Sequence, residues 1–344
     1  MSSISSLRPR DDKATYMKIN PKAKLSRKLF SKTIETAATR DGYGQGLVSL
    51  GEKNEKVVVL CADLTESTRC RHFAAKFPER FVEVGVAEQN LAGLASGLAM
   101  AGYIPFISSF AVFSPGRNWE QIRVSICYSN FNVKIVGSHA GISTGPDGAT
   151  HQALEDIALM RVLPNMTVVA PADAIEARKA TEEAAEKKGP VYLRLTRSES
   201  PVFTTAKTPF QIGRAEVLTF GNDVTIISCG PFVYLALRAA AALAKTYKIK
   251  AEVINCHTIK PLDIKTIVQS AGKTGAVVTV EEHQIGCGLG SAVAECLVEN
   301  QPVPMRLVGM PDSFGESGEP DELLEKYGLT VERIVGAVLE IIDK

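Results

Sequence analysis

Short apolar, β-branched runs alternate with longer stretches of helical character from residue 31 onward. Alternation of this kind predicts strands separated by helices, and therefore parallel sheets covered by helices on both faces. A polar stretch with two prolines, from about residue 198 to 213, divides the pattern into two series. The predicted strands are 57–63, 81–85, 133–138, 167–171 and 191–197 in the first series, and 223–230, 251–256 and 276–282 in the second.

The ends of the chain differ from the rest of the pattern. Residues 1–30 are polar, lack a hydrophobic period and finish in a basic cluster, which predicts a flexible N-terminal arm. An amphipathic helix from about Val331 to Ile342 closes the chain. We therefore expect α/β domains at residues 31–200 and 214–344, joined by a linker at 201–213.

Composition narrows the classes of partner. A 344-residue chain with 45% hydrophobic and 22% charged residues suits two folded domains, and a net charge of +1 offers no field that would draw nucleic acid or an anionic membrane. Seven cysteines without a Cys-x-x-Cys pair suggest buried reduced thiols. No apolar run reaches about 18 residues, the length of a membrane span. These features predict a cytoplasmic protein.

Functional side chains follow several predicted strands. Asp63 and Ser67 follow the first strand, Glu88 the second, His139 the third, and Arg197 the last of the first series. The carboxyl ends of parallel strands are where open α/β sheets bind ligands, so these side chains are candidates for a shared site. Spacing alone leaves a second reading of Glu88, as an acidic residue in the first helical turn that complements the helix dipole.

Four segments carry a resemblance to the transketolase family. FVEVGVAEQNLAGLASGLAMAGYIPFISSFAVF and GSHAGISTGPDGATHQALED resemble its pyrimidine-binding domain. TIETAATRDGYGQGL and VVTVEEHQIGCGLGSAVAE are also similar to the family, and the likeness runs collinearly from about residue 31 to 344. The resemblance implies a pyrimidine-binding α/β domain followed by a transketolase C-terminal domain, and a thiamine-diphosphate-dependent enzyme of the pentose phosphate type.

The resemblance also implies residues that contact the cofactor. At the position of Glu88 the family has a glutamate that hydrogen-bonds the 1′ nitrogen of the aminopyrimidine and so favours its imino form. Phe110 and Phe113 align with aromatic residues that pack around this ring, and Asp63 is expected to contact the cofactor as well. The run SPGRNWEQIR, directly after Phe113, departs from the family pattern.

A second group of residues is implied for the substrate. Arg40, Ser67 and Arg197 fall where transketolases hold the terminal phosphate of a sugar, with His139 assisting, because arginine donors suit a phosphate dianion. By the same resemblance, Asp147 contacts a sugar hydroxyl. His139 and His151 line the channel beside the reacting carbon as candidates for proton transfer.

One family motif is missing from the chain. Nowhere does Gly-Asp-Gly precede an Asn by some 25–30 residues, the spacing of the family's magnesium and diphosphate site. We therefore expect a separate subunit that holds the diphosphate and Mg²⁺, in a heterotetramer that acts on sugar phosphates. Two alternatives stay open: the beta subunit of a 2-oxo-acid dehydrogenase, and a scaffold subunit without catalysis. A deoxyxylulose-phosphate synthase is disfavoured because that enzyme is one long chain.

Overall fold

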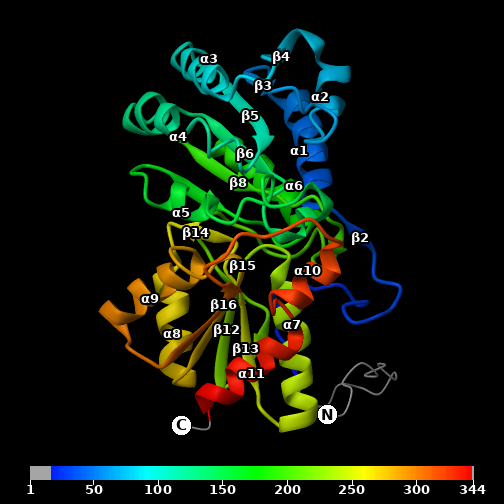
Figure 1. The fold of residues 1–344 in the computed structure, drawn as a ribbon, viewed down its shortest axis with the longest axis vertical. Helices are drawn as coiled ribbons and strands as arrows, with labels where there is room; N and C mark the ends of the chain where they lie inside the picture. The colour runs from blue at the N-terminus through cyan, green and yellow to red at the C-terminus, as the bar shows by residue number, and fades with distance from the viewer. Residues whose placement is uncertain (1–16, 343–344) are drawn as a thin grey trace.

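The computed structural model describes residues 17–342 and contains two α/β lobes stacked end to end (Figure 1). A seven-stranded sheet forms the centre of the first lobe and a five-stranded sheet the centre of the second. Two α/β domains with parallel-dominated sheets are the fold class expected from the alternating pattern, and the structure confirms it.

The first sheet has the order β14-β7-β8-β6-β5-β3-β4, and every pair except β14 with β7 is parallel. Each predicted strand of this domain is present, although several end earlier than the apolar runs suggest. The elements of the first domain are β2 (Thr36–Ala37), α1 (Thr39–Lys53), β3 (Val57–Cys61), α2 (Arg71–Lys76), β4 (Phe81–Glu83), α3 (Glu88–Met100), β5 (Ile104–Phe110), α4 (Trp119–Gln121), a π-helical segment (Ile122–Tyr128), β6 (Lys134–Ser138), a 3-10 turn (Ile142–Asp147), α5 (Asp156–Arg161), β7 (Thr167–Val169), α6 (Ala174–Glu186), β8 (Val191–Arg194) and β9 (Ser200–Pro201).

The second sheet has the order β10-β13-β12-β15-β16, in which only β10 runs antiparallel to its neighbour. The closing helix has the predicted bounds, whereas β16 and the short antiparallel strands were not predicted. The elements of the second domain are β10 (Glu216–Val217), β11 (Thr219–Phe220), β12 (Val224–Ser228), α7 (Phe232–Ala242), β13 (Ala251–Asn255), β14 (Thr258–Lys260), α8 (Ile264–Thr274), β15 (Val277–Gln284), α9 (Leu289–Asn300), β16 (Met305–Met310), α10 (Pro320–Lys326) and α11 (Val331–Ile342).

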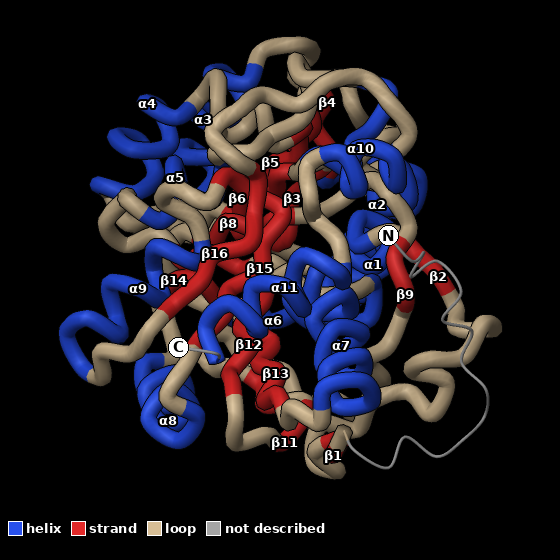
Figure 2. The backbone as a smooth tube through the Cα atoms, turned by 60° about the horizontal axis from the view of Figure 1, so that its bottom comes forward, coloured by secondary structure: helices blue, strands red, loops and turns tan. Residues whose placement is uncertain are grey.

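Helices cover both faces of the two sheets, and Figure 2 shows the strands as a central band between them. Apolar side chains of α1 and α6 pack on one face of the first sheet, and those of α3 and α5 pack on the other. In the second domain α7 and α11 cover one face, while α8 and α9 cover the face whose core is continuous with that of the first domain. Strands such as β3 and β6 are buried at every position, as expected for parallel strands covered on both sides.

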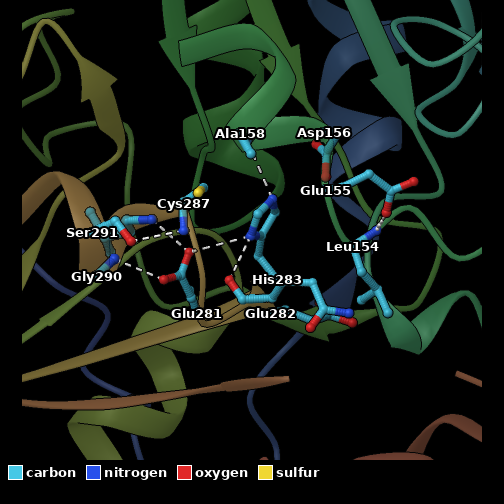
Figure 3. Close-up of polar contacts among 12 residues, drawn as sticks. Leu154, Glu155, Asp156, Ala158, Glu281, Glu282, His283, Cys287, Gly290 and Ser291 are labelled. Carbon is cyan, nitrogen blue, oxygen red and sulfur yellow. Dashed lines mark hydrogen bonds and ion pairs between the residues drawn. The ribbon is translucent and has the colours of Figure 1, made fainter. Parts of the chain in front are cut away.

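Buried polar groups connect the two domains (Figure 3). Within the second domain, Glu281, in β15, accepts hydrogen bonds from the first amides of α9, Leu289 (2.6 Å) and Gly290 (2.8 Å). The two residues that follow it in β15 reach the first domain. His283 Nε2 accepts a longer one from the amide of Ala158 in α5 (3.4 Å). Glu282 Oε1 accepts from the amide of Ser143 (2.6 Å), in the 3-10 turn of the first domain. The second domain therefore holds a turn of the first domain that carries Asp147, one of the predicted site residues.

The predicted N-terminal arm needs a correction. Residues 1–16 lie outside the described residues, but residues 17–30 are packed rather than free: β1 (Lys18–Ile19) pairs with β11, and Ala23 and Leu29 are buried in the core of the second domain. These apolar residues are spaced too irregularly to show a helical or strand period, so the pattern concealed their burial. Across residues 17–342, no helix is both long enough and apolar enough to cross a membrane.

Candidate functional site

Glu88 is the first residue of α3, at the edge of the sheet where the strands end. Its side chain is only 3% exposed, and its Oε2 atom has no hydrogen-bond partner among the described residues. The nearest cation is Arg117, whose Nε lies 3.9 Å from Oε2 and whose side chain is 69% exposed. A buried carboxylate oxygen without a donor is costly, so this atom is suited to a ligand that donates or shares a proton.

The rings of Phe110 and Phe113, which the resemblance assigns to the cofactor, lie at and just after the end of β5 and contact the ring of His151. Phe110 and Phe113 stack with centroids 6.1 Å apart and an interplanar angle of 15°. The imidazole of His151 meets both rings edge-on, at 6.1 and 5.4 Å, and its Nδ1 lies 2.9 Å from the hydroxyl of Thr150. Together these rings form an apolar wall with one polar member, which suits a flat heteroaromatic ligand.

His139 follows β6 and contacts both the aromatic wall and the arginines. Its ring stacks on Phe110 with centroids 3.7 Å apart, and its backbone is left-handed with φ of 56°. Nδ1 lies 2.9 Å from Ser138 Oγ, and Nε2 lies 3.4 Å from Arg40 Nη1. Burial first, and then the charges of Arg40 and Arg197, lower the pKa of His139 to about 3. The ring is therefore neutral, with Nε2 as acceptor and the proton assigned to Nδ1.

The predicted anion-binding residues meet beside His139. Arg40 Nη1 donates to the carbonyl of Ser67 (2.8 Å), and Arg40 Nε is buried without a partner among the described residues. Arg197 Nη1 donates to Thr144 O (2.8 Å) and to Asp147 Oδ1 (3.2 Å). Burial and the charges of Arg69 and Arg197 lower the pKa of Arg40, although Asp41 raises it. Of the residues predicted for the substrate, Arg40 thus contacts Ser67 and His139, and Arg197 contacts Asp147.

The contacts of Asp63, unlike those of the other predicted site residues, do not point to a ligand. It is exposed after β3 in a left-handed conformation (φ of 57°), and its amide donates to Glu83 Oε1 (2.7 Å). The contact is made by the backbone, so it shapes the loop that carries Ser67 and does not itself indicate a role for the Asp63 carboxylate.

Sequence reasoning missed residues that hold the site in place. Asn118 is fully buried, and its Nδ2 donates to the carbonyl of Glu88 (3.0 Å) and to Ser114 Oγ (3.2 Å). Arg117 faces the carboxylate of Glu88, and Arg69 pairs with Asp41. The departure of the SPGRNWEQIR run from the family pattern was the only signal for the first two. No spacing rule relates Arg69 to Asp41, because the pair joins a loop to a helix.

Comparisons with known proteins agree with this arrangement. Residues 35–202 match the model described as "Transketolase, pyrimidine binding domain", and residues 213–334 match "Transketolase, C-terminal domain". A "Putative transketolase C-terminal section" of Methanocaldococcus jannaschii is 47% identical over 89% of this chain and 96% of its own length. The "6-deoxy-6-sulfo-D-fructose transketolase subunit SqwH" of Clostridium sp. strain MSTE9 is 44% identical over 92% of this chain and 98% of its own.

A solved structure supports the same conclusion at the level of the fold. The chain described as "Split gene transketolase, inactive beta4 tetramer" superposes with a TM-score of 0.83 and is 52% identical, covering 89% of this chain and 98% of that chain. The two domain models, the relatives that match over nearly their full length and the solved split-gene chain all belong to the same family. The chain belongs to the transketolase family, whose pyrimidine-binding and C-terminal domains it contains and whose members depend on thiamine diphosphate.

Proposed function

We propose that this chain is the pyrimidine-binding subunit of a transketolase, which moves a two-carbon ketol group from a ketose phosphate to an aldose phosphate. The observation that carries the proposal is Glu88, a buried carboxylate with one oxygen unpartnered within residues 17–342. Asn118 joins the start of its helix to Ser114, the residue directly after Phe113, whose ring stacks on Phe110. A scaffold subunit has no use for an unsatisfied buried carboxylate, since such a group costs stability.

The residues fit the aminopyrimidine of thiamine diphosphate. Glu88 would hold the ring nitrogen through Oε2, and Phe110 and Phe113 would pack against the ring and exclude water that competes for that hydrogen bond. Asn118 fixes the start of α3 through the Glu88 carbonyl, so the carboxylate is pre-positioned. When bound, thiamine diphosphate supplies the carbanion chemistry that cleaves and forms the carbon–carbon bond of a ketose.

The remaining residues are suited to a sugar phosphate. Arg40, whose Nε has no partner among the described residues, would donate to a terminal anion, and Arg197 and the hydroxyl of Ser67 would add donors. Asp147 would accept from a sugar hydroxyl. Because His139 is neutral with Nε2 accepting, it would accept a hydrogen bond from a sugar hydroxyl. His151, next to the aromatic wall, would carry protons to and from the reacting oxygens.

A partner subunit with the diphosphate and Mg²⁺ site completes the proposed enzyme. Large apolar side chains are exposed on and around α3 and the neighbouring π-helical segment, which suits a protein interface. The relatives named above are described as a section or a subunit of transketolases, and the split-gene chain alone is described as an inactive β4 tetramer. We infer an assembly with two copies of each subunit. The exposed side chains are Val86 (77%), Leu94 (42%), Met100 (74%), Val124 (42%) and Tyr128 (87%).

The test is an assay of the assembled complex. The chain is purified from its native source with its bound partner, and turnover is compared between xylulose 5-phosphate with ribose 5-phosphate and pyruvate with an electron acceptor. Ketol transfer from the first pair, absent when the chain is assayed alone, is the expected result. Oxidation of pyruvate instead would assign the chain to a 2-oxo-acid dehydrogenase, and activity of the chain alone would refute the need for a partner.

A further inference from the structure

A third arginine belongs to the cluster of Arg40 and Arg197, and the function proposed above does not use it. Arg69 lies in the loop after β3, two residues beyond Ser67. Its backbone is left-handed (φ of 68°), and its Nε–H donates to Asp41 Oδ1 over 2.6 Å. The side chain of Arg69 is 24% exposed, so it lies mostly within the protein surface instead of extending into solvent.

Contacts on both sides fix the position of Arg69. Asp41 is itself held at the start of α1, where its Oδ2 accepts from the amide of Ala38 (3.2 Å). Arg40, the neighbour of Asp41, reaches back to the loop by donating to Ser67 O. A Cβ atom on Gly44 would lie 2.9 Å from Arg69 Cβ and 3.1 Å from its carbonyl oxygen, so only glycine lets the loop lie this close to α1. The loop and helix thus form one unit with Arg40 and Arg69 on it.

Positive charge in this unit exceeds negative charge. Asp41 pairs with Arg69 and Asp147 pairs with Arg197, but no carboxylate pairs with Arg40 within the described part of the chain. The charge of Arg69 acts on Arg40 and on His139. In each case burial lowers the pKa most, and the charge of Arg69 is among the charges that lower it further. Gathering guanidinium groups in this way is unfavourable until an anion compensates them.

We propose that Arg69, held by Asp41, is a specificity-determining residue that makes the proposed phosphate site of Arg40, Ser67 and Arg197 select a doubly charged phosphate monoester over a singly charged sulfonate or an uncharged sugar end. This inference rests on the proposed function, since the phosphate is that of the sugar. A phosphate and a sulfonate present three oxygens in nearly the same tetrahedral shape, so hydrogen-bond geometry alone separates them poorly. The second charge of the phosphate is what a further guanidinium recognises.

The kinetic test compares donors that differ only at this end of the molecule. In the assembled complex, Arg69→Gln is expected to lower kcat/KM for a ketose phosphate about tenfold or more, mainly through KM. For the unphosphorylated ketose the change should stay below about twofold. The corresponding sulfonate, with one charge, should lose less than the phosphate, so the preference for phosphate over sulfonate should shrink. Arg69→Lys, which keeps the charge, should recover part of the loss. Equal losses for all three donors would mean a structural role and overturn the proposal.

Binding of inorganic phosphate to the same complex, measured by calorimetry, tests the inference without turnover. Arg69→Gln should weaken it, whereas Arg71→Gln should not, because Arg71 is 48% exposed and pairs with Glu66 at the surface. If no donor is turned over but phosphate binding still depends on Arg69, the proposed function fails and the inference on Arg69 stands. Absent phosphate binding in the wild type, or equal affinity in wild type and Arg69→Gln, would refute the inference.

Discussion

Replacing Arg194 by methionine should strongly destabilise the protein. Arg194 is 4% exposed and Asp156 is 1% exposed, and their ion pair is 2.9 Å long. Arg194 Nη2 also donates to the carbonyl of Glu282 (2.8 Å), across the domain boundary. Burial alone would lower the pKa of Arg194, but the charges of Asp156 and Glu282 outweigh burial and raise it above its ordinary value. The carboxylates around Arg194 therefore stabilise its positive charge by more than burial disfavours it.

The cost follows from what the substitution leaves behind. Methionine fills most of the volume but leaves the Asp156 carboxyl group buried without its cation, with the hydroxyl of Tyr192 as its one donor within residues 17–342 (2.7 Å). Removing one partner of a buried ion pair costs about 3–5 kcal/mol. For a domain of this size that loss lowers Tm by roughly 6–20 °C. Thermal unfolding followed by circular dichroism measures it, and ketol-transfer activity of the complex should decline at lower temperature in parallel.

A matched control separates burial from charge. Arg161 and Glu295 also form an ion pair across the two domains, but Glu295 is 66% exposed. Glu295→Gln should cost less than about 1 kcal/mol, as surface pairs do. The double variant Arg194→Met with Asp156→Leu should recover part of the loss, because an apolar pair replaces a buried ionic one at small cost. If Arg194→Met melts within about 1 °C of Glu295→Gln, the reasoning about this pair is wrong.

Three further outcomes follow from single residues. Glu88→Gln in the complex should reduce ketol transfer about 100-fold or more while Glu120→Gln, at an exposed position, leaves it unchanged; unchanged turnover in the first would favour a scaffold. Burial, followed by the charge of Asp173, raises the pKa of Glu176 from 4.5 to about 8, so between these pH values the folded state keeps a proton that the unfolded state releases. The free energy of unfolding should therefore fall as pH rises from about 4.5 to about 8. Urea titrations of Glu176→Gln should lack this dependence on pH. With its pKa lowered to about 3, His139 should show constant ring ¹⁵N shifts in NMR above about pH 5, and a titration near neutrality would contradict its neutral assignment.

The sequence alone determined which segments form strands and helices, because these elements depend on residues close together along the chain. Runs such as Val57–Cys61 are buried at every position and read as central parallel strands, and the helical period of residues 331–342 marks α11. The collinear family segments single out Glu88, Phe110 and Phe113, and the residues predicted to bind phosphate, from the sequence alone. Each of these features depends on neighbours close along the chain or on an extended match.

Other features exist only in the folded molecule, since they join residues that no period relates. Asp41 and Arg69 meet because a loop packs on α1 at Gly44. Arg194 and Glu282, 88 residues apart, meet because the second domain closes on β8. Protonation is also tertiary: an ordinary histidine titrates near neutrality, and it is the low-dielectric pocket with several arginines that keeps His139 neutral. The types of side chain were encoded locally, but their charge states and partners were decided by which distant segments were buried together.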